Sequence, residues 1–331
     1  MPSQTPIKNV VVLGATGNIG LPIVKALVNH RNHYSVTAVT RNAAKSKSLF
    51  PPQVKVAESD LSPSSLRTLF QDQDAVVSCV TSNSIATQKS IIDVALESGI
   101  RRFIPSEFGM DSGNPAAADL IPLIATKVPL TEYLKANQDQ MSWTAIITGM
   151  FFDWALRNPF PLAYDIPNRK AVVYDSGEYE HECTNIDKIG EAVAALLSPE
   201  HEEETANEFV YVNSFTATQN KVVAAIEEAM GEKMEVTRDT SLGLRERMLG
   251  AREKDPNDPI TGLGLIVASF FGVGGLNEYS KNTKSRLWNV RLGLREEFLE
   301  ETVREEVAKW KKGAGENDSM SRSNRKPGQA E

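Results

Sequence analysis

The sequence predicts an α/β protein in which a doubly wound parallel sheet is accompanied by a smaller C-terminal lobe. Two observations lead to this prediction. Short apolar runs alternate with helical patterns through the first 150 residues, and such alternation is typical of βαβ units, whose right-handed crossovers build a parallel sheet. From Phe151 onward the alternation stops, because Pro159, Pro161 and Pro167 interrupt the chain.

The first apolar run, Val10–Leu13, leads through a glycine-rich turn into a helix. In such units the first glycine allows the tight turn, the second lets a pyrophosphate approach the backbone, and the third lets helix and strand pack closely. The N–H groups and positive dipole end of the helix then bind phosphate. The alternative is a tight turn that binds no ligand. We predict a Rossmann-type dinucleotide site that includes Gly14, Thr16, Gly17, Asn18, Ile19 and Gly20.

The elements that follow are read from apolar runs and helix stop signals. The expected strands of the first domain are 36–40, 54–57, 74–80, 102–106 and 143–147, and its expected helices are 63–70, 85–98 and one that includes 131–137. Beyond Phe151 we expect a β-like piece at 170–174, a helix at 186–197, a strand at 208–212 that returns to the main sheet, and a helix at 219–230.

These elements predict a domain organisation with a returning chain. Residues 6–150 form the nucleotide-binding domain, which the chain re-enters around 183–230, and residues 151–312 form mainly a substrate-binding lobe. Residues 313–331 contain no aromatic or β-branched residue, which is typical of a disordered tail.

Composition excludes several classes of function. The chain has 331 residues, 41% hydrophobic and 24% charged, with a net charge of −7 that argues against nucleic-acid binding. Its two cysteines provide neither a disulfide framework nor a metal site. The start resembles no secretory signal, and the uncharged run Ile260–Leu276 is short and glycine-rich for a membrane span. We therefore expect a soluble cytoplasmic protein without a membrane or nucleic-acid partner.

The residue at the end of the second strand predicts the cofactor. An acid there favours NAD, whereas an arginine accommodates the 2′-phosphate of NADP. Arg41 occupies this position, Lys45 follows, and no acid precedes Glu58. These observations predict NADP(H), with Asp60 near the adenine. The alternative is that Arg41 is only a solvated strand end.

The most common short-chain dehydrogenase arrangement is absent from this sequence. It needs a tyrosine with a lysine four residues later, and none of the seven tyrosines has one. An epimerase or carbonyl reductase that uses this pair is therefore disfavoured.

Several segments together resemble the isoflavone reductase-like group, which includes phenylcoumaran benzylic ether and pinoresinol–lariciresinol reductases and borders the NmrA-like proteins. The segments are Gly14–Gly20, Arg41, Arg102–Gly109, and Lys127 ahead of Glu132 and Tyr133. The resemblance implies NADPH as the cofactor, a catalytic acid/base at Lys127, and a sixth strand end (Gly149–Trp154) that reaches nicotinamide and substrate. It also implies further cofactor contacts from Ser106, Lys127 and Phe151, and substrate contacts from Glu107, Phe108, Phe152 and Trp154. We expect the nicotinamide where the first and fourth strands diverge, beside Val80, Thr81 and Ser82.

Lys127 also has a physical case of its own. It is the only cation between Pro115 and Glu132, within an apolar stretch. Desolvation favours the neutral form of a lysine and prepares it for proton exchange, although its stem could pack while its head reaches water. Pro122 and Pro129 favour a helix start near Lys127.

Other features leave two explanations each. Phe151, Phe152 and Trp154 could stack on an aromatic substrate or belong to the core. His181 and Cys183 fit a half-exposed strand edge better than a nucleophile pair. The run Ile260–Leu276 could be a mobile cover over the substrate, with five glycines for freedom of movement, or a dimer contact.

The sequence therefore predicts an NADPH-dependent reductase that transfers hydride to a small aromatic or conjugated substrate, with Lys127 as the proton donor and a homodimer as one possible state. The alternative is a non-catalytic, NmrA-like NADP(H) sensor that binds a partner protein.

Overall fold

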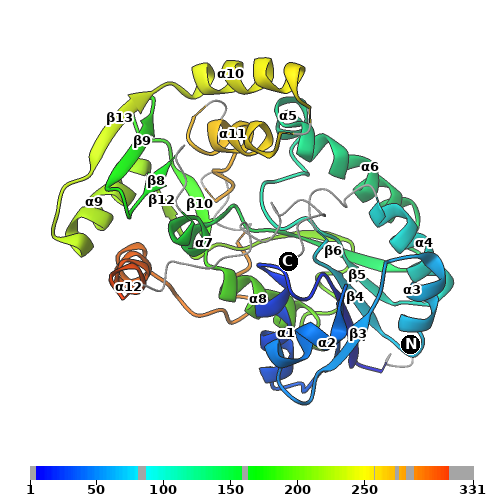
Figure 1. The fold of residues 1–331 in the computed structure, drawn as a ribbon. Coiled ribbons are helices and arrows are strands. Elements are labelled where there is room, and N and C mark those ends of the chain that lie inside the picture. Colours follow the sequence, from blue (N-terminus) through cyan, green and yellow to red (C-terminus); the bar gives the residue numbers. More distant parts are fainter. Residues whose placement is uncertain are drawn as a thin grey trace, which may run out of the picture. The chain divides into compact units, whose positions relative to one another are not determined.

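The computed structural model describes residues 5–80, 87–158, 163–256, 258–272, 276–280 and 287–312. The chain divides into two compact units, and each contains several separate stretches of sequence (Figure 1). The first unit comprises Met1–Thr148, Ile186–Asn213 and Tyr279–Arg295. The second comprises Gly149–Asn185, Ser214–Glu278 and Glu296–Glu331.

The first unit is built on a seven-stranded sheet in the order β11-β6-β5-β4-β1-β2-β3. Every pair of neighbouring strands is parallel. The strands are β1 (Asn9–Leu13), β2 (Ser35–Thr40), β3 (Lys55–Glu58), β4 (Ala75–Ser78), β5 (Arg102–Ile104), β6 (Ser142–Ile147) and β11 (Glu208–Tyr211). The prediction of a doubly wound parallel sheet is confirmed, and the expected returning strand is β11, which pairs with β6.

Helices cover both faces of this sheet. The helices of this unit are α1 (Gly20–Asn29), α2 (Ala43–Ser46), α3 (Pro63–Leu69), α4 (Gln88–Glu97), α5 (Pro115–Leu120), α6 (Pro122–Ala136) and α8 (Ile186–Leu196), with a short 3₁₀ turn, η1 (Lys47–Leu49). Helices α1 and α8 pack together on one face, and α3, α4 and α6 follow one another on the other (Figure 1). Gly190 permits the α1–α8 contact, because a Cβ there would lie 2.7 Å from the Pro22 carbonyl oxygen.

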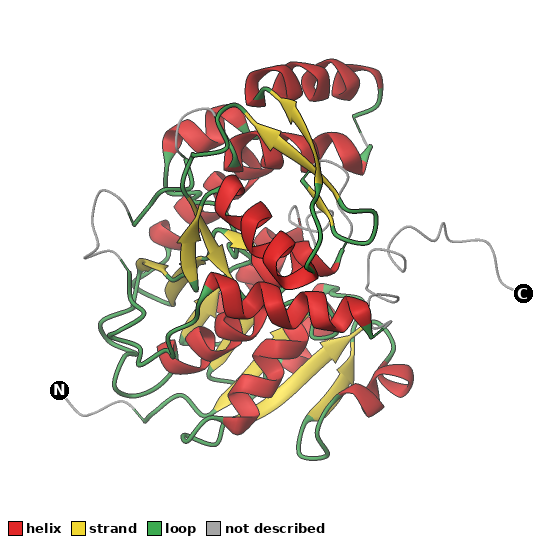
Figure 2. Ribbon diagram, turned by 90° about the vertical axis from the view of Figure 1, so that its left-hand side faces the viewer, coloured by secondary structure: helices red, strands yellow, loops and turns green. Residues whose placement is uncertain are grey.

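The core of the first unit explains why its strands are continuous apolar runs. Val10–Leu13 of β1 and all four residues of β4 are buried, as expected for strands covered on both faces. Trp143 is 1% exposed and meets Phe209 edge to face at 5.5 Å between ring centroids. Figure 2 shows the strands in yellow between red helices.

The second unit contains two three-stranded sheets, ordered β12-β10-β7 and β13-β9-β8. Their strands are β7 (Met150–Phe151), β8 (Tyr164–Asp165), β9 (Lys170–Tyr174), β10 (His181–Thr184), β12 (Phe215–Ala217) and β13 (Glu235–Asp239). Its helices are α7 (Phe152–Arg157), α9 (Gln219–Met230), α10 (Ser241–Lys254), α11 (Pro259–Phe270) and α12 (Leu299–Lys311). Helix α9 ends at Gly231, whose φ of 76° is the left-handed conformation of a helix C-cap.

The expectation of a half-exposed strand edge at His181 and Cys183 is wrong. Both residues lie in β10, the middle strand of its sheet, and both are fully buried. The ring of His181 meets Phe271 edge to face at 5.0 Å, and its Nε2 has no hydrogen-bond partner among the described residues.

Most of the run Ile260–Leu276 forms α11, which packs against α10. Phe271 is 1% exposed and contacts the rings of Tyr164 and Tyr174. Gly272 has a packing reason of its own, because a Cβ there would overlap Ser241. Close packing is what requires glycine here. Gly274 and Gly275 lie outside the described residues, as does the predicted tail at 313–331.

Of the helices that the structure describes, none has the length and apolar character needed to cross a membrane.

The burial of His181 predicts a loss of stability in acid. Desolvation lowers the pKa of His181 to about 4 from 6.5, so the unfolded chain takes up a proton before the folded chain does. The stabilising contribution is complete above pH 6.5 and is lost as pH falls through 4. By linkage it amounts to about 3 kcal/mol in the free energy of unfolding. Urea unfolding at pH 7, 5.5 and 4.5 should show this loss in the wild-type chain and a much smaller loss in His181→Leu.

His33→Asn is the matched control, because His33 is exposed and its φ of 49° suits asparagine. This variant should keep the wild-type pH dependence. An unchanged pH dependence in His181→Leu would contradict the assignment.

Candidate active site

The glycine turn between β1 and α1 is shaped by close backbone contacts. Gly14 has a φ of 70°, and a Cβ there would overlap the carbonyl oxygen of Cys79, just beyond β4. A Cβ at Gly20 would overlap the Gly14 carbonyl oxygen. The Gly17 N–H donates to the same oxygen at 3.0 Å. Glycine is therefore required at positions 14 and 20 by packing alone.

Helix α1 begins directly after this turn without a side-chain cap among the described residues, and its first turn has no acid. Thr16 is exposed, and Asn18 and Ile19 are partly exposed. A helix start with this composition suits an anionic ligand, because its N–H groups and dipole carry partial positive charge.

The turn after β2 holds the two predicted cations. Arg41 and Lys45 are both exposed. The Asn42 side chain caps α2 by accepting from the Lys45 N–H at 3.0 Å, and the Thr40 hydroxyl accepts from the Asn42 N–H at 3.2 Å. These bonds fix the backbone between the cations while leaving both side chains to solvent.

Although no acid precedes Glu58 in the sequence, Glu58 itself brings a carboxylate to the turn that holds these cations. Glu58 ends β3, which runs parallel to β2 in the register Thr40↔Glu58. Its Oε2 accepts from the Ala43 N–H at 3.0 Å, within the same turn. Glu58 and Ala43 are 15 residues apart in the sequence. Their contact follows from the register of β2 and β3, which the sequence alone does not give.

Asp60 is exposed just beyond β3. Hydrogen bonds from Ser62, one of them from its N–H at 2.9 Å, lower the pKa of the Asp60 carboxyl. An open, polar hollow of about 580 Å³ lies here, lined by Glu58, Ser59, Asp60, Ser62, Ser64 and Ser65. This is the region where the sequence places the adenine.

The ends of β4 and β5 are tied together by Ser106. Its hydroxyl donates to the Val80 carbonyl at 3.0 Å, and its N–H donates to Oε1 of Gln88 at 3.0 Å. The sequence reasoning missed Gln88, which is 1% exposed at the start of α4. The predicted contacts Thr81 and Ser82 lie outside the described residues.

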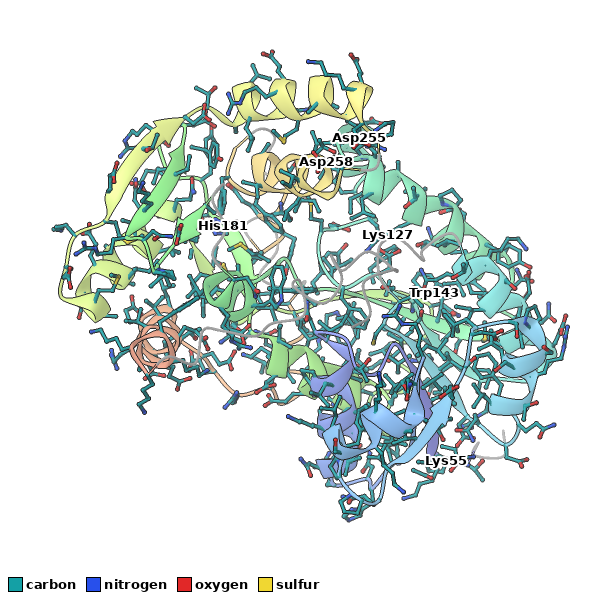
Figure 3. The ribbon with its side chains drawn as sticks, viewed as in Figure 1. Lys55, Lys127, Trp143, His181, Asp255 and Asp258 are labelled. Atoms are coloured by element: carbon teal, nitrogen blue, oxygen red, sulfur yellow. The ribbon has the colours of Figure 1, made fainter. Side chains whose placement is uncertain are left out.

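Lys127 lies inside a helix, which contradicts the expected helix start. It is the sixth residue of α6, and the helix continues through Pro129. The lysine side chain is 7% exposed. Figure 3 labels it on α6.

Glu107 is the described ion-pair partner of Lys127. Its Oε2 lies 3.8 Å from Lys127 Nζ, and its side chain is 1% exposed. Neither carboxylate oxygen has a hydrogen-bond partner among the described residues. A buried carboxylate without hydrogen bonds is costly, so packing alone does not explain this pair.

The predicted aromatic contacts differ in exposure. Phe108 is 7% exposed in the first unit. In the second unit Phe152 is fully buried and meets Phe215 edge to face at 5.0 Å, which is the packing explanation. Phe151 and Trp154 are partly exposed.

Comparisons with known proteins place this chain in a family. Residues 6–248 match the model of the NmrA-like family. Oxidoreductase aprR of Aspergillus flavus is 37% identical over 227 residues, which cover 67% of this chain and 74% of that protein. The crystal structure of isoflavone reductase matches with a TM-score of 0.72 at 21% identity, covering 91% of this chain and 99% of that chain.

The NADPH binary complex of leucoanthocyanidin reductase from Vitis vinifera matches with a TM-score of 0.74 at 18% identity, again covering 91% and 99% of the two chains. These structural likenesses show the shared fold. The predicted family and the oxidoreductase class are confirmed, and this chain belongs to the NmrA-like family.

Proposed function

We propose that this chain is an NADPH-dependent reductase that delivers hydride to a small aromatic or conjugated substrate, with Lys127 as the proton donor. The observation that carries the proposal is the buried Lys127–Glu107 pair. Glu107 follows the carboxyl end of β5, and the glycine turn follows the carboxyl end of β1. In open α/β sheets, ligands bind outside this edge, at the point where the strand order reverses.

The residues of the first unit fit an NADPH molecule. The uncapped start of α1 suits the pyrophosphate, and the exposed Arg41 and Lys45 suit a 2′-phosphate. Leucoanthocyanidin reductase from Vitis vinifera, which shares this fold, has been solved as a binary complex with NADPH. NADPH, when bound, supplies the hydride.

Lys127 supplies the proton in this proposal. Hydride addition to a conjugated carbon pushes negative charge onto the substrate oxygen or nitrogen. A buried ammonium stabilises that charge strongly, because little water screens it. The proton passes from Nζ to that atom, and Lys127 regains a proton from solvent after product release. Glu107 offsets the cost of burying the ammonium.

The first prediction of this proposal concerns cofactor preference. The wild-type chain should bind NADPH at least tenfold more tightly than NADH, about 1.4 kcal/mol. Arg41→Ala should remove most of that difference by weakening NADPH binding alone. Calorimetric titration with both cofactors measures it. Lys55→Ala is the control. Lys55 (Figure 3) is an exposed cation at the first residue of β3, whereas Glu58, which bonds to the turn that carries Arg41, is the last residue of β3. Equal weakening in both variants would contradict the role of Arg41.

The second prediction concerns Glu58. Its charge lies in the turn that carries Arg41 and Lys45, so it repels a 2′-phosphate there. Glu58→Gln keeps an acceptor for the Ala43 N–H and should raise the NADPH-to-NADH affinity ratio by roughly three- to tenfold at low salt. The gain should shrink at high salt. Glu97→Gln, an exposed carboxylate on α4, should leave the ratio unchanged, and an unchanged ratio in Glu58→Gln would exclude the repulsion.

The third prediction concerns Lys127. Lys127→Met and Lys127→Arg should both lower kcat by about 100-fold or more, the range expected for a positioned acid, while NADPH affinity stays within about threefold. Arginine keeps the ion pair but does not release a proton readily, so it separates catalysis from folding. Lys135→Met, exposed on the same helix, should retain full turnover.

A panel of enones, isoflavones and benzylic ethers serves as the substrate set for that measurement. Full turnover in Lys127→Arg would remove Lys127 from the mechanism. A wild-type chain that binds NADPH but reduces none of the panel would support the sensor alternative.

A further inference from the structure

The Glu107 carboxylate is a buried acceptor for which the described residues provide no hydrogen-bond donor. The residue is fully buried, and both side-chain oxygens are without hydrogen-bond partners among the described residues. The Lys127 ammonium, at 3.8 Å from Oε2, is beyond hydrogen-bond distance. Buried carboxylates usually accept hydrogen bonds from nearby donors. Asp111, four residues after Glu107, does so: it accepts from the Gly113 N–H at 2.9 Å and from the Tyr211 hydroxyl at 3.2 Å.

The position of Glu107 is fixed by its neighbours rather than by its own side chain. Ser106 is bonded to the Val80 carbonyl and to Gln88, and the Glu107 N–H donates to the Pro105 carbonyl at 2.8 Å. These bonds fix the backbone at Glu107, and the described residues leave the acceptor capacity of its carboxylate unused. Burying such a group without a donor costs several kcal/mol, so a donor other than the described residues is expected.

Resting on the function proposed above, we infer that Glu107 accepts a hydrogen bond from a substrate hydroxyl group adjacent to the oxygen that Lys127 protonates. The preferred substrate class is then a hydroxy-carbonyl compound whose two oxygens are neighbours. Glu107 acts as the specificity-determining residue, and Lys127 as the proton donor.

The geometry of the pair suits this class. Two ligand oxygens about 2.7 Å apart can each lie about 2.8 Å from one member of a pair whose atoms are 3.8 Å apart. Lys127 has only donors and an ionised Glu107 has only acceptors. The pair therefore matches a carbonyl oxygen beside a hydroxyl, whereas a methyl ether at the second position leaves the carboxylate without a donor.

A hydroxyl lost from such a site is costly, because the buried carboxylate is then left unpaired. The probes are 2′-hydroxychalcone and 2′-methoxychalcone, two enones that differ only at the oxygen beside the carbonyl. In the presence of NADP⁺, the wild-type chain should bind the hydroxy compound at least tenfold more tightly than the methoxy compound, as measured by calorimetry.

Glu107→Gln should reduce that preference at least fivefold while NADPH affinity stays unchanged. Asp111→Asn is the matched control, since Asp111 is a buried carboxylate of the same loop with donors of its own, and it should keep the wild-type preference. Thermal unfolding of each variant checks that it is folded. If Glu107→Gln does not fold, the wild-type comparison of the two chalcones still decides the inference.

Equal affinity of the wild-type chain for the two chalcones, or binding of neither, would overturn the inference, as would a preference that survives in Glu107→Gln. The result is separate from the proposed reductase activity. A hydroxyl preference without turnover of either chalcone would keep the role of Glu107 and count against reduction.

Discussion

The close approach of the glycine turn to the end of β4 determines where the candidate site lies. Gly14 leaves no room for a Cβ beside the Cys79 carbonyl, so β1 and β4 end side by side. Ser106 then ties the loop after β5 to Val80. The path from the turn to Glu107 is thus a chain of backbone contacts at one edge of a parallel sheet. A side chain added at Gly14 would displace every group beyond it.

Burying the Lys127–Glu107 pair carries a cost in folding free energy. Two buried charges lose their hydration, and their attraction seldom exceeds that loss unless hydrogen bonds complete the shell. Here the shell is incomplete on the Glu107 side among the described residues. The apolar stretch around Lys127 could have packed well with a leucine in its place. Stability therefore gives no reason for the pair, whereas the proton transfer proposed for Lys127 would give one.

The sheet was largely predictable from the sequence, because β1 and β4 are buried on both faces and read as uninterrupted apolar runs. The position of Lys127 within α6 was not. An interior proline removes one backbone hydrogen bond and normally ends a helix, but α6 continues past Pro129 because Ile124, Leu130 and Leu134 pack in the interior. Tertiary packing overrode the local rule.

The site was predictable by residue type but not by pairing. Lys127 stands out in the sequence as a lone cation among apolar residues. That Glu107 meets it, or that Glu58 meets the Ala43 N–H, follows only from strand register and helix placement. The short strands of the second unit gave a weaker signal still. Four residues such as His181–Thr184 carry too little periodicity to distinguish a central strand from an edge.

The contact between Gly190 and the Pro22 carbonyl has a consequence for folding during synthesis on the ribosome. Helix α8 covers α1, yet more than 150 residues separate the two in the sequence. A ribosome releases α1 and most of the sheet long before α8 and β11 emerge. During that interval the face of α1 at Pro22 and Ala26, which Gly190 approaches in the finished protein, has no α8 to cover it, so the nascent first unit exposes this face to any chaperone near the exit tunnel.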